Sequence, residues 1–164
     1  MFLFAFSSIA NAQTSLHVGV APGDSSSMAY DVYVQHAFNP WYSNETIELS
    51  PIVHLGFSAW DRSDSTTWGG NLGGGLKLNF LTGDTWSPFI SGTFGGAWIS
   101  RDEFGSRKMG DHWQFQSRAS VGVELGESRR FIVKLDYTHY SNAHTNDDNS
   151  GYSTWGASVG YAFF

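Results

Sequence analysis

The stretch "HWQFQSRASVGVEL", residues 112–125, alternates between apolar and polar side chains. Because successive side chains of a β-strand point to opposite faces, this pattern predicts a strand with one apolar and one polar face. A helix would instead repeat its apolar positions every three or four residues. The apolar positions are Trp113, Phe115, Ala119, Val121, Val123 and Leu125, and the polar positions are Gln114, Gln116, Arg118, Ser120 and Glu124.

The same alternation recurs along the chain and is interrupted by turn-rich pieces such as "PGDSSS" and "LTGDTWS". Tilted strands of about ten residues cross a bilayer, and bacterial barrels have even strand numbers from eight upward. We therefore predict an all-β fold, an eight-stranded antiparallel transmembrane β-barrel. The predicted strands are 14–22, 28–38, 46–58, 67–80, 87–99, 112–125, 130–141 and 152–164.

A soluble β-sandwich or lipocalin-like barrel also alternates, but it turns its apolar face inward. The positions of the tryptophans favour a membrane barrel over a soluble one. Most of them lie near predicted strand ends, where the aromatic girdles of membrane barrels meet the membrane interfaces. The polar faces then fill a narrow interior in which opposite charges can pair. The tryptophans are Trp41, Trp60, Trp68, Trp86, Trp98, Trp113 and Trp155, and the interior charges are Lys77, Arg118, Glu124, Lys134 and Asp136.

The beginning of the chain and its bulk composition indicate an exported protein. Residues 1–12 combine a short apolar run with Ala10-Asn11-Ala12, an A-x-A cleavage pattern, so we expect a signal peptide at 1–12 and the barrel domain at 13–164. The chain has no cysteine, which excludes disulfides and thiolate metal sites, and its net charge of -6 argues against nucleic acid. The bacterial outer membrane is the expected location.

A histidine and a serine end the seventh segment on its lipid-facing side. His139 and Ser141 are two residues apart, so they share a face with their Cα atoms about 7 Å apart. Bacterial barrels have both termini in the periplasm, so this strand ends at the cell surface. An imidazole can take the proton of a hydroxyl that attacks an ester carbonyl. By spacing alone, contact with lipid head groups is the alternative.

The segment "HYSNA", His139–Ala143, on the penultimate strand resembles the lipid A 3-O-deacylases of the PagL family. The resemblance implies an esterase that removes the 3-O-linked acyl chain of lipid A, the anchor of lipopolysaccharide, without a cofactor or metal. It implies Ser141 as nucleophile, His139 as base, and Asn142 and the backbone N–H of His144 as oxyanion donors. The partner is then lipopolysaccharide in the outer leaflet, and a homodimer is compatible with the sequence.

The third member of the triad departs from the family pattern. The family has a glutamate at the start of the last strand, where this chain has Ser153. Asp147 and Asp148 in the last loop, and Asp111 beside the sixth strand, are the alternative acids. Basic residues of the longest outer loop could meet lipid A phosphates. They are Arg101, Arg107 and Lys108.

Two other functions fit a small outer-membrane barrel. The first is a non-enzymatic barrel with a structural or surface-interaction role, in which His139 and Ser141 tolerate replacement. The second is a palmitoyl-transfer barrel that holds an acyl chain inside, which the charged interior disfavours.

Overall fold

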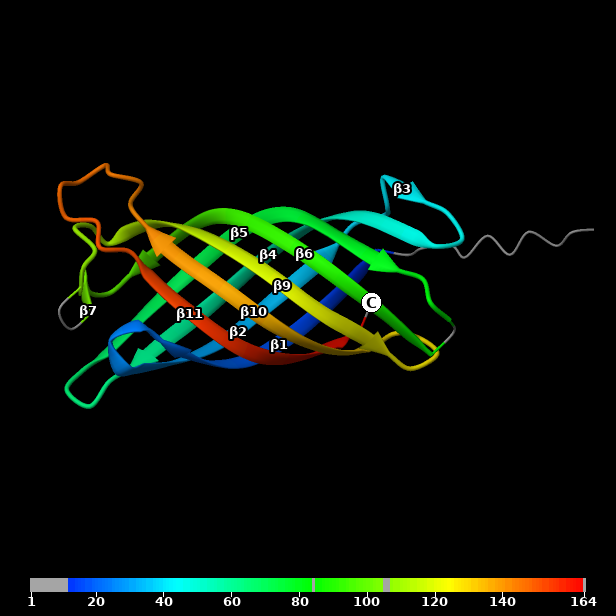
Figure 1. Cartoon of the computed structure of the whole chain (residues 1–164), viewed down its shortest axis with the longest axis horizontal. Coiled ribbons are helices and arrows are strands. Elements are labelled where there is room, and N and C mark those ends of the chain that lie inside the picture. Colours follow the sequence, from blue (N-terminus) through cyan, green and yellow to red (C-terminus); the bar gives the residue numbers. More distant parts are fainter. Residues whose placement is uncertain (1–11, 84, 105–106, 164) are drawn as a thin grey trace, which may run out of the picture.

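The computed structural model describes residues 12–83, 85–104 and 107–163, which form a closed antiparallel barrel (Figure 1). Each long strand pairs with its neighbour along the chain, and the first and last strands pair to close the barrel. The predicted eight-stranded barrel is confirmed. The strands are β1 (Gln13–Gly23), β2 (Ser27–Ala37), β4 (Ile47–Asp61), β5 (Thr66–Phe80), β6 (Trp86–Ile99), β9 (Trp113–Leu125), β10 (Phe131–Ser141) and β11 (Tyr152–Ala162).

Short elements lie at the two ends of the barrel. The 3-10 turn η1 (Asp24–Ser26) joins β1 to β2, and β7 (Glu103–Phe104) pairs with β8 (Arg107–Lys108) in a loop hairpin. The strand β3 (Tyr42–Ser43) lies at the end that holds the C-terminus, and β7 lies at the other end (Figure 1). In the described residues, no helix has the length and apolar character needed to cross a membrane. The predicted signal peptide lies outside the described residues, apart from Ala12.

The apolar face of each strand points outward. On β10, Leu135 is 62% exposed, whereas its neighbour Lys134 is 3% exposed. This arrangement is the reverse of a soluble barrel and leaves an apolar wall for lipid. The predicted orientation is therefore confirmed.

Charged side chains fill the interior in pairs. Lys77 pairs with Glu124, and Lys134 lies 3.4 Å from Asp136. Arg118, also predicted to pair, lies 3.5 Å from Asp31 on β2 and stacks over Tyr33. Buried charges need partners of this kind because desolvation of an unpaired charge is costly. A lumen so filled leaves no apolar channel for an acyl chain.

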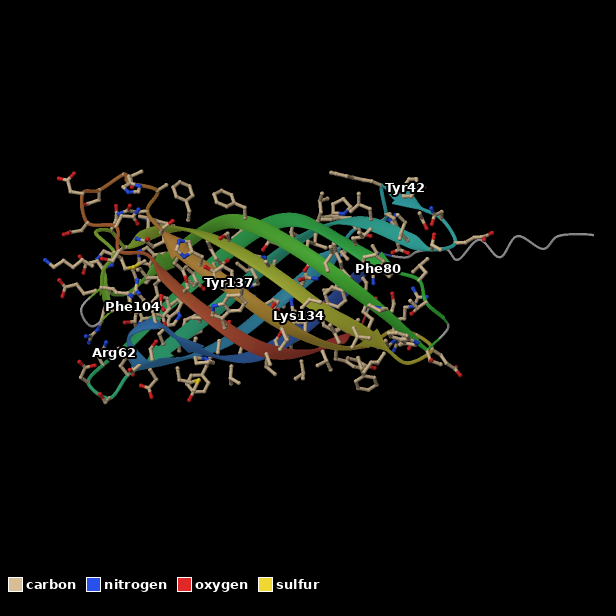
Figure 2. The ribbon with its side chains drawn as sticks, in the orientation of Figure 1. Tyr42, Arg62, Phe80, Phe104, Lys134 and Tyr137 are labelled. Carbon is tan, nitrogen blue, oxygen red and sulfur yellow. The ribbon has the colours of Figure 1, made fainter. Side chains whose placement is uncertain are left out.

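An apolar cluster closes the interior at the end of the barrel that holds β7. Trp60 is 2% exposed and packs edge-on against Phe104 and Tyr140, with ring centroids 5.5 and 5.3 Å away. Tyr152 and Met109 complete its surroundings, and Figure 2 shows Phe104 at this end. Trp60 departs from the predicted girdle because β4 continues to Asp61, which places residue 60 on the inward face. The cluster ties the loops to the inward faces of β10 and β11.

Candidate active site

His139 and Ser141 are the last outward-facing residues of β10, and both are half-buried. They follow Leu135 and Tyr137 on the same face, and Tyr137 is visible on the wall in Figure 2. Among the described residues, neither Nε2 of His139 nor Oγ of Ser141 has a hydrogen-bond partner. The two groups are therefore available to a substrate at the outer rim, and such pairs often tighten only when substrate binds.

Ser153 contacts the imidazole on its other nitrogen. It lies opposite His139 in the register of β10 and β11, and its Oγ is 2.9 Å from His139 Nδ1. The hydroxyl of Tyr137 is 3.2 Å from the same Oγ. This geometry fits the tautomer in which Nδ1–H donates to Ser153 and Nε2 accepts. Ser153, which stands where the family pattern has a glutamate, is therefore in contact with the imidazole.

Gly151 allows the imidazole to lie close to the start of β11. Its φ of 62° is in the left-handed region that favours glycine, and an added Cβ would lie 3.0 Å from Cε1 of His139. A larger residue here would strain the backbone and push against the ring. The ring is consequently held between Gly151 and Ser153.

The three aspartates proposed as alternative acids are not brought to His139. Asp111 Oδ1 accepts a hydrogen bond from the backbone N–H of Trp113 at 3.0 Å, so its carboxylate caps the start of β9. Asp147 and Asp148 are exposed in the outer loop 142–151. In the part of the chain that the structure describes, none of these carboxylates makes a hydrogen bond or ion pair with the imidazole.

Asn142 organises the outer loop 142–151 instead of pointing into solvent. Its side chain is 1% exposed, and Nδ2 donates to the backbone carbonyls of Met109 and Asp148, each at 2.8 Å. Its backbone N–H donates to Asn149 Oδ1 at 3.1 Å, and its Oδ1 accepts the N–H of His144 at 2.9 Å. The predicted oxyanion donors, Asn142 and the His144 N–H, are therefore both occupied in this structure, because the loop uses them to hold its own turn.

Ala143 follows Ser141 by two residues at a sharp turn of the chain. Its φ is 53° and that of His144 is 64°, so the chain turns sharply directly after Ser141. The N–H of Ala143 has no hydrogen-bond partner within the described residues. Successive backbone N–H groups at such turns can form concave anion sites.

Asp24 and Arg107 are two site neighbours that sequence reasoning did not identify in these roles. Oδ2 of Asp24 accepts the backbone N–H of Ser153 at 3.0 Å and lies 3.5 Å from the Arg107 guanidinium. Arg107 also donates to the carbonyls of Ser150 and Gly151, both at 3.0 Å. A usable signal was present, since the first and last strands of a closed barrel are neighbours, which places η1 beside the start of β11.

An apolar groove runs down the wall below His139. Its volume is about 590 Å³, and it lies between β9, β10 and β11. The rings of Tyr137 and Trp155 are 4.4 Å apart at its rim. Its lining residues are Ala119, Ser120, Val121, Leu135, Asp136, Tyr137, Trp155 and Gly156.

The fold places the chain among small outer-membrane barrels. The serine and the histidine on its outer wall are the side-chain types that a serine hydrolase uses. The sequence model of one family, described as Lipid A 3-O-deacylase (PagL), matches residues 28–162. The chain therefore belongs to the lipid A 3-O-deacylase family and is an outer-membrane protein.

Solved structures agree with this fold. The crystal structure of the outer membrane enzyme PagL has a TM-score of 0.82 at 22% identity and covers 90% of this chain and 98% of that one. The N-terminal β-barrel domain of Pseudomonas aeruginosa OprF has a TM-score of 0.55 at 13% identity, covering 93% and 98%. Neisserial surface protein A has a TM-score of 0.58 at 14% identity, covering 93% and 96%. A search of curated protein sequences gave no match.

Proposed function

We propose that this protein hydrolyses the ester that joins the 3-O-linked acyl chain to lipid A, with Ser141 as nucleophile and His139 as general base. The observation that carries the proposal is the hydrogen bond between His139 Nδ1 and Ser153, which leaves Nε2 for the Ser141 hydroxyl on the lipid-facing wall. Both residues lie at the end of an outward-running strand, where the ester bonds of outer-leaflet lipid are found.

The reaction has two halves. In the first, Ser141 Oγ attacks the ester carbonyl while Nε2 of His139 takes its proton, and the proton then passes to the departing 3-hydroxyl of the sugar. In the second, water activated by the same imidazole hydrolyses the acyl-enzyme. The N–H of Ala143 stabilises the oxyanion, in place of the occupied donors of Asn142 and His144.

The ordinary test is mass spectrometry of lipid A after incubation with the purified barrel in mixed micelles. We expect the mass of lipid A to fall by that of one fatty acid less one water, and the free acid to appear in equal amount. An unchanged lipid A would favour the alternative, a non-enzymatic barrel with a structural or surface-interaction role. A homodimer, if formed, would be seen in the same preparation by cross-linking.

The groove below His139 fits the acyl chain that is removed. Because Ala119 lies beside Tyr137 in the register of β9 and β10, a tryptophan at this position fills the groove. Loss of a few methylene contacts costs about 1–2 kcal/mol, so we expect Ala119→Trp to lower kcat/KM about tenfold. Rates on lipid A substrates with shorter 3-O chains should fall less.

The matched control for this change is Val20→Trp. Val20 also faces outward, on β1, but it does not line the groove. We expect it to leave kcat/KM for lipid A unchanged. Equal losses in both variants would mean that added bulk on the wall disturbs the membrane fit of the barrel, and that the groove does not hold the chain.

A further inference from the structure

Ser153 leaves the imidazole of His139 without a carboxylate partner. A serine can accept the Nδ1–H, but it carries no charge to stabilise the imidazolium that forms when Ser141 gives up its proton. Among the described residues, Asp24 is the acid whose carboxylate is hydrogen-bonded to Ser153, with Oδ2 3.0 Å from the backbone N. These contacts run from His139 on β10 to Ser153 on β11 and then to Asp24 in η1.

We propose that Asp24 is a positioning residue for the deacylation reaction, which acts through Ser153 and supplies the negative charge that the triad otherwise lacks. This inference rests on the proposed function. The carboxylate fixes the backbone of Ser153 and so aims its Oγ at Nδ1, and its charge favours the imidazolium state. No proton passes to Asp24. The proton of Ser141 moves to Nε2 and then to the leaving 3-hydroxyl oxygen.

Arg107 holds the carboxylate in this position. Its guanidinium lies 3.5 Å from the same oxygen of Asp24 and is tied to the carbonyls of Ser150 and Gly151. Both side chains of the ion pair are 36% exposed, so solvent weakens the attraction between them. The pair therefore connects η1 to the start of β11, and the charge of Asp24 is opposed by Arg107 only in part.

Asp24→Asn tests the negative charge of Asp24 separately from its hydrogen bond to Ser153. The asparagine Oδ1 can still accept the N–H of Ser153, so the hydrogen bond is kept while the charge is lost. We expect kcat for release of the fatty acid to fall about tenfold with little change in KM, because the charge acts on the imidazolium and not on lipid binding. Asp24→Glu keeps the charge and should retain most of the rate.

The deciding comparison repeats Asp24→Asn in a Ser153→Glu background. A glutamate at 153 places a carboxylate directly on Nδ1, so the rate should rise, and the charge at position 24 should become unnecessary. We expect Asp24→Asn to cost about tenfold with Ser153 present and nothing with glutamate present. Heat-modifiable migration on gels shows that each variant is a folded barrel.

The outcomes of these measurements distinguish failure of the inference about Asp24 from failure of the proposed function. A rate that is unchanged in Asp24→Asn, or that falls equally in both backgrounds, overturns the inference, since Asp24 would then have no effect or only a scaffold role. Activity that appears only with glutamate at 153 also overturns it, because Asp24 would not replace the missing acid. If neither the natural chain nor the Ser153→Glu variant releases a fatty acid, the proposed function fails and the inference fails with it.

Discussion

Alanine at position 141 is expected to stop release of the 3-O-linked acyl chain while the barrel still folds. The variant removes the hydroxyl of the proposed nucleophile, and its neighbours His139 and Ser153 keep their hydrogen bond. Losing a serine nucleophile costs more than about a thousandfold in kcat. Mass spectrometry of lipid A measures the rate, and the shift of the heated band on a gel reports folding.

Ser15→Ala provides a matched control. Ser15 and His17 have the same two-residue spacing on β1, and Ser15 Oγ lies 2.8 Å from His17 Nε2. This pair faces the barrel interior and is buried, so no lipid ester can reach it. Ser15→Ala should therefore deacylate lipid A at the rate of the natural chain. Full activity in Ser141→Ala would show that Ser141 is not the nucleophile.

The contrast between these two pairs shows which part of the site the sequence could predict. Strand alternation places Leu135, Tyr137 and His139 on one face, so the outward direction of His139 follows from a period of two. The same rule gave the strand number, because each strand repeats it. A local pattern of this kind needs no knowledge of the rest of the chain.

The remaining features depend on contacts between distant segments. Asp24 reaches Ser153 across 129 positions of sequence, through the pairing that closes the barrel. Asn142 was predicted to face the substrate, but the carbonyl of Met109, on another loop, draws its amide inward. No strand periodicity extends into these loops, so their hydrogen bonds could not be read from it.

Removing the ring of Trp60 is expected to weaken both the barrel and its activity. Trp60 fills the space between Phe104, Tyr140 and Tyr152, and replacing a buried tryptophan by alanine costs about 3–5 kcal/mol. Tyr140 and Tyr152 alternate with the outward residues His139, Ser141 and Ser153, so a cavity behind them loosens the strand ends that hold the site. We expect a lower urea midpoint for the refolded barrel and a lower kcat.

Trp41→Ala separates this effect from the general loss of a tryptophan. Trp41 is 73% exposed and directly precedes β3, which lies at the opposite end of the barrel from β7 (Figure 1). Its removal should lower the urea midpoint only slightly and leave kcat unchanged. If Trp60→Ala instead lowers the midpoint while kcat is unaffected, the interior cluster stabilises the barrel without positioning the serine and histidine. The rigidity of the site must then come from other contacts, among them the pairing of β10 with β9 and β11.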